Sequence, residues 1–124
     1  MNREIKFRGK NYENKWKYGD LVQEKWGQGK AIMIKKETTA WSVLEDTVGQ
    51  YTGLHDKNGK EIYEGDIVKI KYRDEDIGKV IYEHNGFSID VTNMNKNYGR
   101  VSFVNNFIEV IGNIYDNPEL LGEK

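Results

Sequence analysis

Apolar and polar residues alternate along this chain in short runs. In Ile67–Tyr72, the apolar side chains at every second position from Val68 share one face of an extended chain, and Lys69 and Lys71 share the other. A period of two is typical of a β-strand with one buried and one solvent-facing side. The pattern therefore predicts a half-buried strand over Ile67–Tyr72.

Turn-forming dipeptides separate the apolar runs. Asn58-Gly59 and Asn85-Gly86 each combine two residues that tolerate positive φ, which is a strong local signal for a β-hairpin. The second dipeptide lies within Lys79–Val91, which is predicted to form a hairpin. The same alternation predicts further strands at Ile5–Arg8, Trp16–Val22, Ala31–Ile34, Trp41–Leu44, Val48–Leu54, Glu61–Tyr63, Val101–Val104 and Phe107–Ile114.

Polar and glycine-rich stretches are expected to be loops. Gly27 and Gly29 predict a flexible loop, Arg73–Asp76 a charged and solvated one, and Thr92–Arg100 a long one. In the first strand, Ile5–Arg8, the basic side chains are expected on an outer, solvent-facing side.

The C-terminal region carries a helix-start pattern. Asn117-Pro118-Glu119 places an N-cap residue, a first-turn proline and an early acid in succession. A short helical turn that docks Leu120 and Leu121 is therefore predicted.

Short strands at a spacing of roughly ten residues, joined by turns, favour a mainly β fold. We expect a small SH3-like barrel or a barrel-like sandwich of short antiparallel strands, with a short C-terminal helical turn. Glu64–Ile70 resembles the way in which SH3-like barrels enter their first strand. A chain of 124 residues is expected to form one domain over residues 1–124, with N-terminal strands over about 1–47 and a central and C-terminal β core over about 48–121.

Composition supports a β fold and narrows the function classes. Branched Ile and Val outnumber Leu and Ala, which suits strands. Mean hydropathy is low at −0.81, so the eight Tyr, three Trp and four Phe must supply much of the core area. With 19 basic and 20 acidic residues, the chain lacks the strong electrostatic drive of a general nucleic-acid or anionic-membrane binder, although balanced totals can hide a local basic patch.

The chain contains no cysteine, which excludes disulfides, thiolate metal sites and cysteine nucleophiles within it. A cysteine-free chain fits a reducing compartment. The sequence also shows neither a signal-peptide pattern nor an apolar run of about 18 residues. We therefore expect a cytoplasmic protein without a membrane partner.

Asp56, Asn58 and Gly59 briefly match the start of a calcium-binding EF-hand loop. The EF-hand needs glycine at its sixth position and glutamate at its twelfth. Counted from Asp56, Gly59 is the fourth residue and Ile67 the twelfth. A turn is therefore the better interpretation, and no metal or other cofactor is predicted.

Glu61, Glu64 and Asp66 lie close together in sequence beside Tyr63, and paired carboxylates can do acid–base chemistry. Acidic residues are so frequent here that such a cluster arises by chance. No catalytic, cofactor-binding or metal-ligating residue is assigned. An enzyme whose carboxylate site is assembled only in the fold is kept as an alternative.

Histidine occurs only at positions 55 and 84, beside predicted turns. Neither His55 nor His84 has a metal-ligand pattern or a nucleophile motif around it. The glycine motifs of phosphate-binding loops and dinucleotide sites are also absent. Exposed or capping roles are favoured for both histidines.

Trp16, Tyr18 and Trp26 are candidates for a surface on which the bases of single-stranded nucleic acid stack. Five basic residues lie near the first two of them: Lys6, Arg8, Lys10, Lys15 and Lys17. Core packing is the stronger explanation for aromatic residues that alternate along strands. A β-barrel that binds single-stranded nucleic acid is kept as a second alternative.

Three segments together resemble one protein family. They are Ile5–Arg8, Gln50–Val68 and Glu109–Leu121. Through them the chain is similar to the YopX family of small phage and prophage proteins, and Trp26–Ala40 carries no part of the likeness. The turn and strand-entry residues of the central signature are Thr52, Gly53, Asp56, Asn58, Gly59, Tyr63, Gly65 and Asp66.

The resemblance implies a bacterial virus or an integrated prophage as the source and the bacterial host cell as the location. It brings no established activity, cofactor or catalytic residue. Strand edges and surface aromatics are association elements. We therefore expect a non-enzymatic accessory protein that acts through protein–protein contacts, by self-association and with a phage or host protein.

Overall fold

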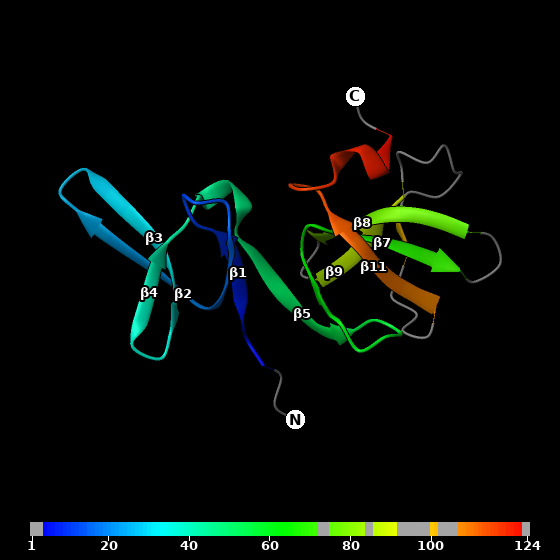
Figure 1. Cartoon of the computed structure of the whole chain (residues 1–124), viewed down its shortest axis with the longest axis horizontal. Helices are drawn as coiled ribbons and strands as arrows, with labels where there is room; N and C mark the ends of the chain where they lie inside the picture. Colours follow the sequence, from blue (N-terminus) through cyan, green and yellow to red (C-terminus); the bar gives the residue numbers. More distant parts are fainter. Residues whose placement is uncertain (1–3, 72–74, 84–85, 92–99, 102–106, 123–124) are drawn as a thin grey trace. The chain divides into compact units, whose positions relative to one another are not determined.

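The computed structural model of the chain describes residues 4–71, 75–83, 86–91, 100–101 and 107–122 (Figure 1). Within these residues the structure is mostly β-strand, and its helical segments are short 3₁₀ turns. The prediction of a mainly β fold with short strands is confirmed.

The chain divides into two compact units, Met1–Tyr51 and Thr52–Lys124, called here the first and the second unit. Strand β5 (Gly49–His55) begins in the first unit and ends in the second. That the whole chain makes one domain stays a prediction.

Hydrogen bonds connect the strands into two sheets. A six-stranded sheet has the order β4-β3-β2-β1-β5-β6, and a five-stranded sheet has the order β10-β9-β8-β7-β11. Over the described residues neither order closes on itself through paired strands. The two sheets are therefore not a closed barrel, and a barrel-like sandwich is the predicted alternative that is consistent with them.

The first unit is built from the N-terminal strands, which follow one another as neighbours. Its elements are β1 (Phe7–Lys10), β2 (Trp16–Trp26), β3 (Gly29–Lys36), β4 (Thr39–Ser42) and the 3₁₀ turn η1 (Glu45–Thr47). All adjacent pairs from β1 to β4 are antiparallel. The strands predicted at Trp16–Val22, Ala31–Ile34 and Trp41–Leu44 are present, and β2 and β3 extend further than predicted.

After β4 the chain returns to β1. Val43 forms a bridge with Asn11, and the Leu44 N–H donates to the Lys10 carbonyl at 2.8 Å. The Thr47 hydroxyl fixes this return, because it accepts from the Lys10 N–H at 2.9 Å and donates to the Leu44 carbonyl at 2.7 Å. The turn η1 is thereby held against β1.

Where the sequence predicted a flexible loop, β2 and β3 meet in a tight hairpin. Trp26 pairs with Gly29, so only Gly27 and Gln28 lie between the strands. Gly27 has a φ of 56°, which suits the first central position of a type II′ turn. The prediction of a flexible loop was wrong, because Gly27 adopts the positive φ that a two-residue turn needs. The pairing of β2 with β3 therefore continues up to Trp26 and Gly29.

The basic side chains of β1 are buried, contrary to the prediction of a solvent-facing side. Arg8 is 5% exposed and Lys10 6%, whereas Ile5, just before the strand, is 64% exposed. The register places Arg8 opposite Tyr18 and Lys10 opposite Trp16. The alternation predicts that the basic side chains share one face of the strand. It does not show that aromatic side chains of β2 cover that face.

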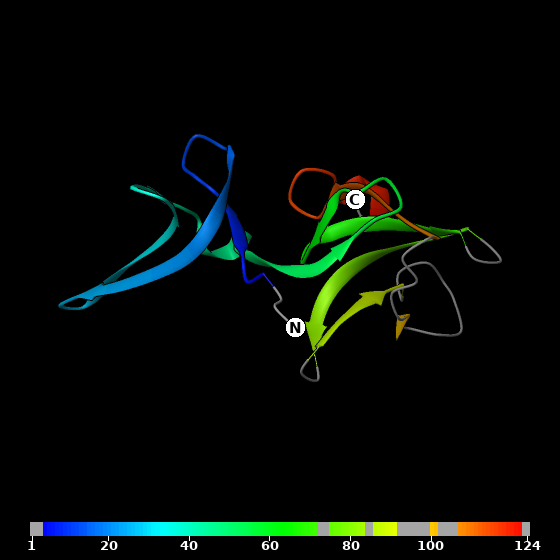
Figure 2. The same ribbon diagram turned by 90° about the horizontal axis from the view of Figure 1, so that it is seen from below.

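The second unit contains the remaining strands. They are the end of β5, β6 (Glu61–Tyr63), β7 (Asp66–Lys71), β8 (Glu75–Glu83), β9 (Gly86–Asp90), β10 (Arg100–Val101), β11 (Ile108–Asn113) and the 3₁₀ turn η4 (Pro118–Leu121). Figure 2 shows β8 and β9 as a hairpin from below. Several predicted features lie outside the described residues: the strand end Tyr72, the loop residues Arg73 and Asp74, the turn residues His84 and Asn85, most of the loop Thr92–Arg100 and the end of the strand Val101–Val104.

Branched aliphatic side chains make the core of the second unit. The buried cluster consists of Ile62, Val68, Ile70, Val80, Ile89, Val91 and Ile108, with Leu54 and Val110 packed against it. Because Ile62 comes from β6 and the others come mainly from the five-stranded sheet, β6 packs across that sheet. This layering is the sandwich-like part of the fold.

Strand β7 is more buried than its alternation predicted. Ile67, on the face opposite Val68, is fully buried, and only Lys71 at the end is exposed. Asp76 is also buried, because it lies in β8 opposite Ile70. The prediction of a solvated loop up to Asp76 was therefore wrong: β8 begins at Glu75 and pairs with β7.

The predicted C-terminal helical turn is present as η4, with Pro118 at its start and Leu121 buried. The Asn117 side chain does not cap it. Its Oδ1 instead accepts from the Asn113 N–H at 3.2 Å. No helix in the described part of the chain is long and apolar enough to cross a membrane.

Candidate functional site

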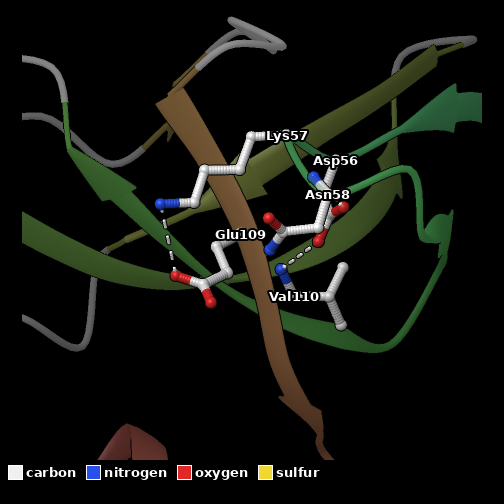
Figure 3. A network of polar contacts seen from close by, with 5 residues as sticks. All are labelled: Asp56, Lys57, Asn58, Glu109 and Val110. Atoms are coloured by element: carbon white, nitrogen blue, oxygen red, sulfur yellow. Dashed lines mark hydrogen bonds and ion pairs between the residues drawn. The ribbon is translucent and has the colours of Figure 1, made fainter.

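The Asp56 carboxylate is the centre of a polar network in the second unit (Figure 3). Its Oδ1 accepts from the N–H groups of Asn58 at 2.8 Å and Lys60 at 2.9 Å. Its Oδ2 accepts from the N–H of Val110 at 2.9 Å. One side chain thus closes the turn after β5 and ties that turn to β11, 54 residues further along the chain.

Two opposing influences set the acidity of Asp56. Burial favours the neutral acid and would raise the pKa, but the three backbone N–H groups and the charge of Lys60 favour the carboxylate. The net effect lowers the pKa of Asp56 below its ordinary value of 3.8. The side chain is therefore an ionised acceptor near neutral pH.

Lys57 adds two contacts between the same turn and β11. Its backbone N–H donates to the Ile108 carbonyl at 3.0 Å, and its Nζ lies 3.7 Å from Oε1 of Glu109 (Figure 3). The ion pair is partly exposed, so its contribution to stability is small. The backbone bond and Asp56 hold the turn in place.

The rest of the family-like signature makes similar contacts. The Thr52 hydroxyl donates to the Ile62 carbonyl at 2.8 Å and accepts from the Leu54 N–H at 3.1 Å. The three signature glycines, Gly53, Gly59 and Gly65, have φ values of 89°, 86° and 93°. These values lie in the left-handed region, which a side chain disfavours.

The bend between β6 and β7 is held by its acid. The buried Asp66 carboxylate accepts from the Tyr63 N–H at 2.7 Å. The Tyr63 hydroxyl donates to Oε1 of Glu61 at 3.0 Å. At the apex, the Gly65 N–H donates to the Val80 carbonyl and its own carbonyl accepts from the Ile114 N–H, both at 2.9 Å.

These contacts show what the signature acids do in the fold. Asp56 and Asp66 each accept from backbone N–H groups, and Glu61 accepts from a tyrosine hydroxyl. No group of three or more His, Cys, Asp or Glu side chains that could hold a metal ion occurs among the described residues. His55 is exposed at the end of β5.

The three aromatic residues singled out as a stacking surface are not brought together. Trp16 and Tyr18 lie at the start of β2, and Trp26 lies ten residues on, roughly 30 Å along an extended strand. The Arg8 guanidinium lies 4.5 Å and Lys10 Nζ 5.5 Å from the centroid of the Trp16 ring. These cation–π contacts account for two of the basic residues near Trp16.

Tyr18 borders a polar hollow of about 320 Å³ with Lys6 and Asp20 in its lining. Its charges are mixed, as Glu4, Lys35, Lys36 and Glu37 complete most of the rim. Lys17, on the other face of β2, lies 4.8 Å from the Trp41 ring centroid. Arg8 and Lys10 thus share the Trp16 ring, whereas Lys6 lies over Tyr51 and Lys17 over Trp41.

The far end of the β2–β3 hairpin has a different character. We call residues Gln23–Lys30 the arm; every residue in it is exposed. Figure 1 shows it as the blue and cyan hairpin reaching past β4 within the first unit. Trp26, at its end, is 65% exposed.

Two adjoining hollows lie beside the arm. The outer hollow, of about 310 Å³, is bordered by Trp26 and by Tyr12, which is 72% exposed. The inner hollow, of about 230 Å³, is lined by Leu21, Gln23, Ile32, Glu45 and Val48. Both share Ile32 and Glu45, and the Glu45 carboxylate pairs with Lys30 Nζ at 3.1 Å.

Sequence reasoning found Trp26 but not these hollows. Tyr12 and Glu45 lie in segments that gave only turn and loop signals, and their position beside Ile32 depends on how β3, β4 and η1 pack. Trp26 next to Gly27 was the one local signal in the sequence that pointed to this end of the hairpin.

The sequence matches the YopX protein family over residues 6–122, which is nearly the whole chain. The chain belongs to the YopX family. The matched range spans the arm of this YopX protein. No curated protein matches the sequence.

A solved structure gives this YopX protein a structural counterpart. It is similar to the crystal structure of protein EF1440 from Enterococcus faecalis, with a TM-score of 0.57 and 23% sequence identity. The similarity covers 97% of this chain and 99% of the other. At that identity the likeness shows a shared fold.

Proposed function

We propose that this YopX protein is a non-enzymatic accessory protein of a bacterial virus or prophage that acts in the host cytoplasm through protein–protein contacts. The observation that carries the proposal is the arm, in which every residue is exposed and Trp26 lies at the end. The family resemblance supports the phage source, and the absence of cysteine supports a reducing compartment.

In the absence of a binding partner, the arm would contribute little to the stability of the fold. An isolated two-stranded hairpin is marginally stable in water, and strands gain stability by packing one face. Every residue of Gln23–Lys30 is exposed, yet the segment ends in a tryptophan, the largest apolar side chain. Exposed tryptophan and tyrosine are enriched among the residues that dominate protein–protein binding.

The acids support a non-enzymatic role. General acid–base catalysis works best when the pKa of the group lies near the working pH. Hydrogen bonds hold the pKa of Asp56 below its ordinary value, and the Asp66 carboxylate accepts from the Tyr63 backbone N–H. Both carboxylates therefore act as acceptors that shape turns.

Capture from phage-infected host cells tests this proposal. The full chain is immobilised, and bound proteins are identified by mass spectrometry for the wild type, Trp26→Ala and Tyr82→Ser. Tyr82 is a matched control because it is an aromatic residue 51% exposed on the β8–β9 hairpin. We expect a specific partner that Trp26→Ala loses and Tyr82→Ser keeps.

The proposal is wrong if all three proteins retain the same partners. It is also wrong if the chain binds single-stranded DNA or RNA with a strong dependence on salt, because neutralised phosphates would then account for the interaction. Titration of a fluorescent oligonucleotide at low and high salt distinguishes that outcome.

A further inference from the structure

Strand β2 has an unpaired edge where it extends beyond β1. On the side of β2 away from β3, β1 pairs only with Trp16–Gly19. From Asp20 to Trp26, no strand in the described part of the chain pairs with that side. An exposed strand edge presents a row of backbone donors and acceptors to which another chain can pair.

The β2–β3 register shows which backbone groups this edge presents. The pair that flanks the tight turn of the arm is hydrogen-bonded, and such pairs alternate along an antiparallel ladder. By this alternation Ile32 bonds away from β2, and its carbonyl accepts from the Val43 N–H at 3.0 Å. On β2, the N–H and C=O groups of Leu21, Gln23 and Lys25 therefore point away from β3. Among the described residues they have no hydrogen-bond partner.

These outward groups are arranged symmetrically about Gln23. If a second copy of β2 lies antiparallel with a two-fold axis at Gln23, Leu21 faces Lys25 of the other copy, and the three N–H and three C=O groups of each strand all find partners. Val22 then faces Glu24, so no like charges lie directly opposite each other. An axis at Glu24 would set two carboxylates opposite each other, which is destabilising.

The same register brings Trp26 to a hollow on the other copy. Residues opposite each other in a sheet share a face, and Trp26 of one copy lies opposite Asp20 of the other, diagonal to Tyr18. Asp20, Tyr18 and the exposed Ile5 border the hollow of about 320 Å³. In its own copy Trp26 lies six residues beyond Asp20, roughly 20 Å along β2, so only a second copy supplies it there.

We propose that two copies of this chain pair through the free edges of β2 and form one antiparallel sheet across a two-fold axis at Gln23, with Trp26 of each copy in the hollow beside Tyr18 of the other. This inference rests on the proposed function, in which the arm is a contact surface. A second copy suits the edge because it supplies an exposed strand with the same spacing of donors and acceptors. Each copy uses its edge once, so the assembly closes as a dimer.

Sedimentation velocity of the full chain tests the edge. Gln23→Pro removes the N–H on the axis and leaves the ladder with β3 intact, because that N–H points away from β3. Gln23→Thr keeps the N–H and is the matched control. We expect a concentration-dependent dimer for the wild type and for Gln23→Thr, and self-association at least roughly tenfold weaker for Gln23→Pro.

Circular dichroism checks that both variants keep the fold. A wild type that stays monomeric at its highest soluble concentration overturns the inference. A folded Gln23→Pro variant that dimerises with unchanged affinity also overturns it.

Single cysteines test the register, because the chain has no cysteine of its own. In a hydrogen-bonded antiparallel pair the two Cα atoms lie about 5.5 Å apart, within the roughly 4.4–6.8 Å that disulfides span. Gln23→Cys should therefore form a covalent dimer under mild oxidation. Lys25→Cys is the control, since its two Cα atoms would be displaced by roughly 13 Å along the strands. Equal cross-linking of the two variants, or none in either, overturns the pairing about Gln23.

Capture from infected cells separates this inference from the proposed function. If the wild type is monomeric while Trp26-dependent capture of another protein persists, the second copy is the wrong occupant and the proposed function stands. If Gln23→Pro also loses that captured protein, a strand of the other protein occupies the edge, and the pairing of two copies is again overturned. If the dimer forms and no Trp26-dependent partner is captured, the pairing stands and the proposed contact with a phage or host protein fails.

Discussion

At the scale of single residues, the acids of this protein connect parts of the backbone that are distant in sequence. Asp56 is 7% exposed and accepts from three backbone N–H groups. Asp66 does the same for one N–H in the next bend. A buried N–H that loses its acceptor lowers the free energy of unfolding by about 1–3 kcal/mol. We therefore expect Asp56 and Asp66 to contribute strongly to the stability of the fold.

Replacement of Asp56 by asparagine should destabilise the second unit. The amide oxygen can still accept from Asn58 and Lys60, but the amide nitrogen is a donor and faces the Val110 N–H. We expect a loss of about 1–3 kcal/mol in the free energy of unfolding, measured by urea denaturation at neutral pH. Glu109→Gln is the control, because its exposed ion pair should cost less than about 1 kcal/mol.

An equal effect of Asp56→Asn and Glu109→Gln would show that the three backbone contacts contribute little. At this scale the sequence allowed the turn over Asp56, Asn58 and Gly59 to be predicted, because local φ preferences and short-range hydrogen bonds decide it. Val110 could not have been predicted as a partner, since the five strands from β6 to β10 lie between it and the turn in sequence.

At the scale of elements, alternation located most strands and missed their ends. The strand at Ile67–Tyr72 and the second strand of the hairpin at Lys79–Val91 are found close to their predicted bounds, whereas the first strand of that hairpin begins earlier, at Glu75. β2 and β3 run to Trp26 and Gly29, where a tight turn continues the pairing. Strand ends depend on the partner strand, and a partner is a tertiary feature.

Strand β8 contains a position at which neighbouring side chains leave no room. A Cβ added at Gly78 would lie 2.7 Å from Val91 Cγ1 and 2.8 Å from both the Asp90 carbonyl oxygen and Ile89 Cγ2. Gly78→Ala should therefore reduce the free energy of unfolding by about 1–3 kcal/mol through overpacking.

Gly86→Ala is the matched control for that substitution. Gly86 begins β9, and nothing lies within 4 Å of its added Cβ. Thermal or urea unfolding of both variants checks the prediction. If Gly86→Ala costs as much as Gly78→Ala, the loss comes from the glycine change itself and not from crowding against β9.

At the scale of the whole molecule, the response to acid should reflect Asp56. A carboxyl whose folded pKa is lowered stabilises the protein fully above its unfolded pKa, near 3.8, and loses this contribution as pH falls through the folded pKa. The stability difference between the wild type and Asp56→Asn should therefore be largest near neutral pH and shrink below pH 3.8.

Urea unfolding of both proteins over a series of pH values measures this difference. Glu109→Gln again serves as control, since its difference from the wild type should stay small throughout. If the difference in the free energy of unfolding between the wild type and Asp56→Asn is independent of pH, the effect of the substitution does not come from the charge of the carboxylate.

The sequence by itself determined the mainly β composition, most strand positions, the turns at Asn58-Gly59 and Pro118, and the family. Each follows from neighbours along the chain, through a period of two, allowed φ values and local hydrogen bonds. Only the tertiary structure decided that Arg8 and Lys10 are buried beside Trp16, that Asp56 accepts from the Val110 N–H, and that Trp26 is exposed at the border of a hollow. These depend on which strands pair and which faces are covered, and burial and long-range hydrogen bonds are properties of the assembled sheets.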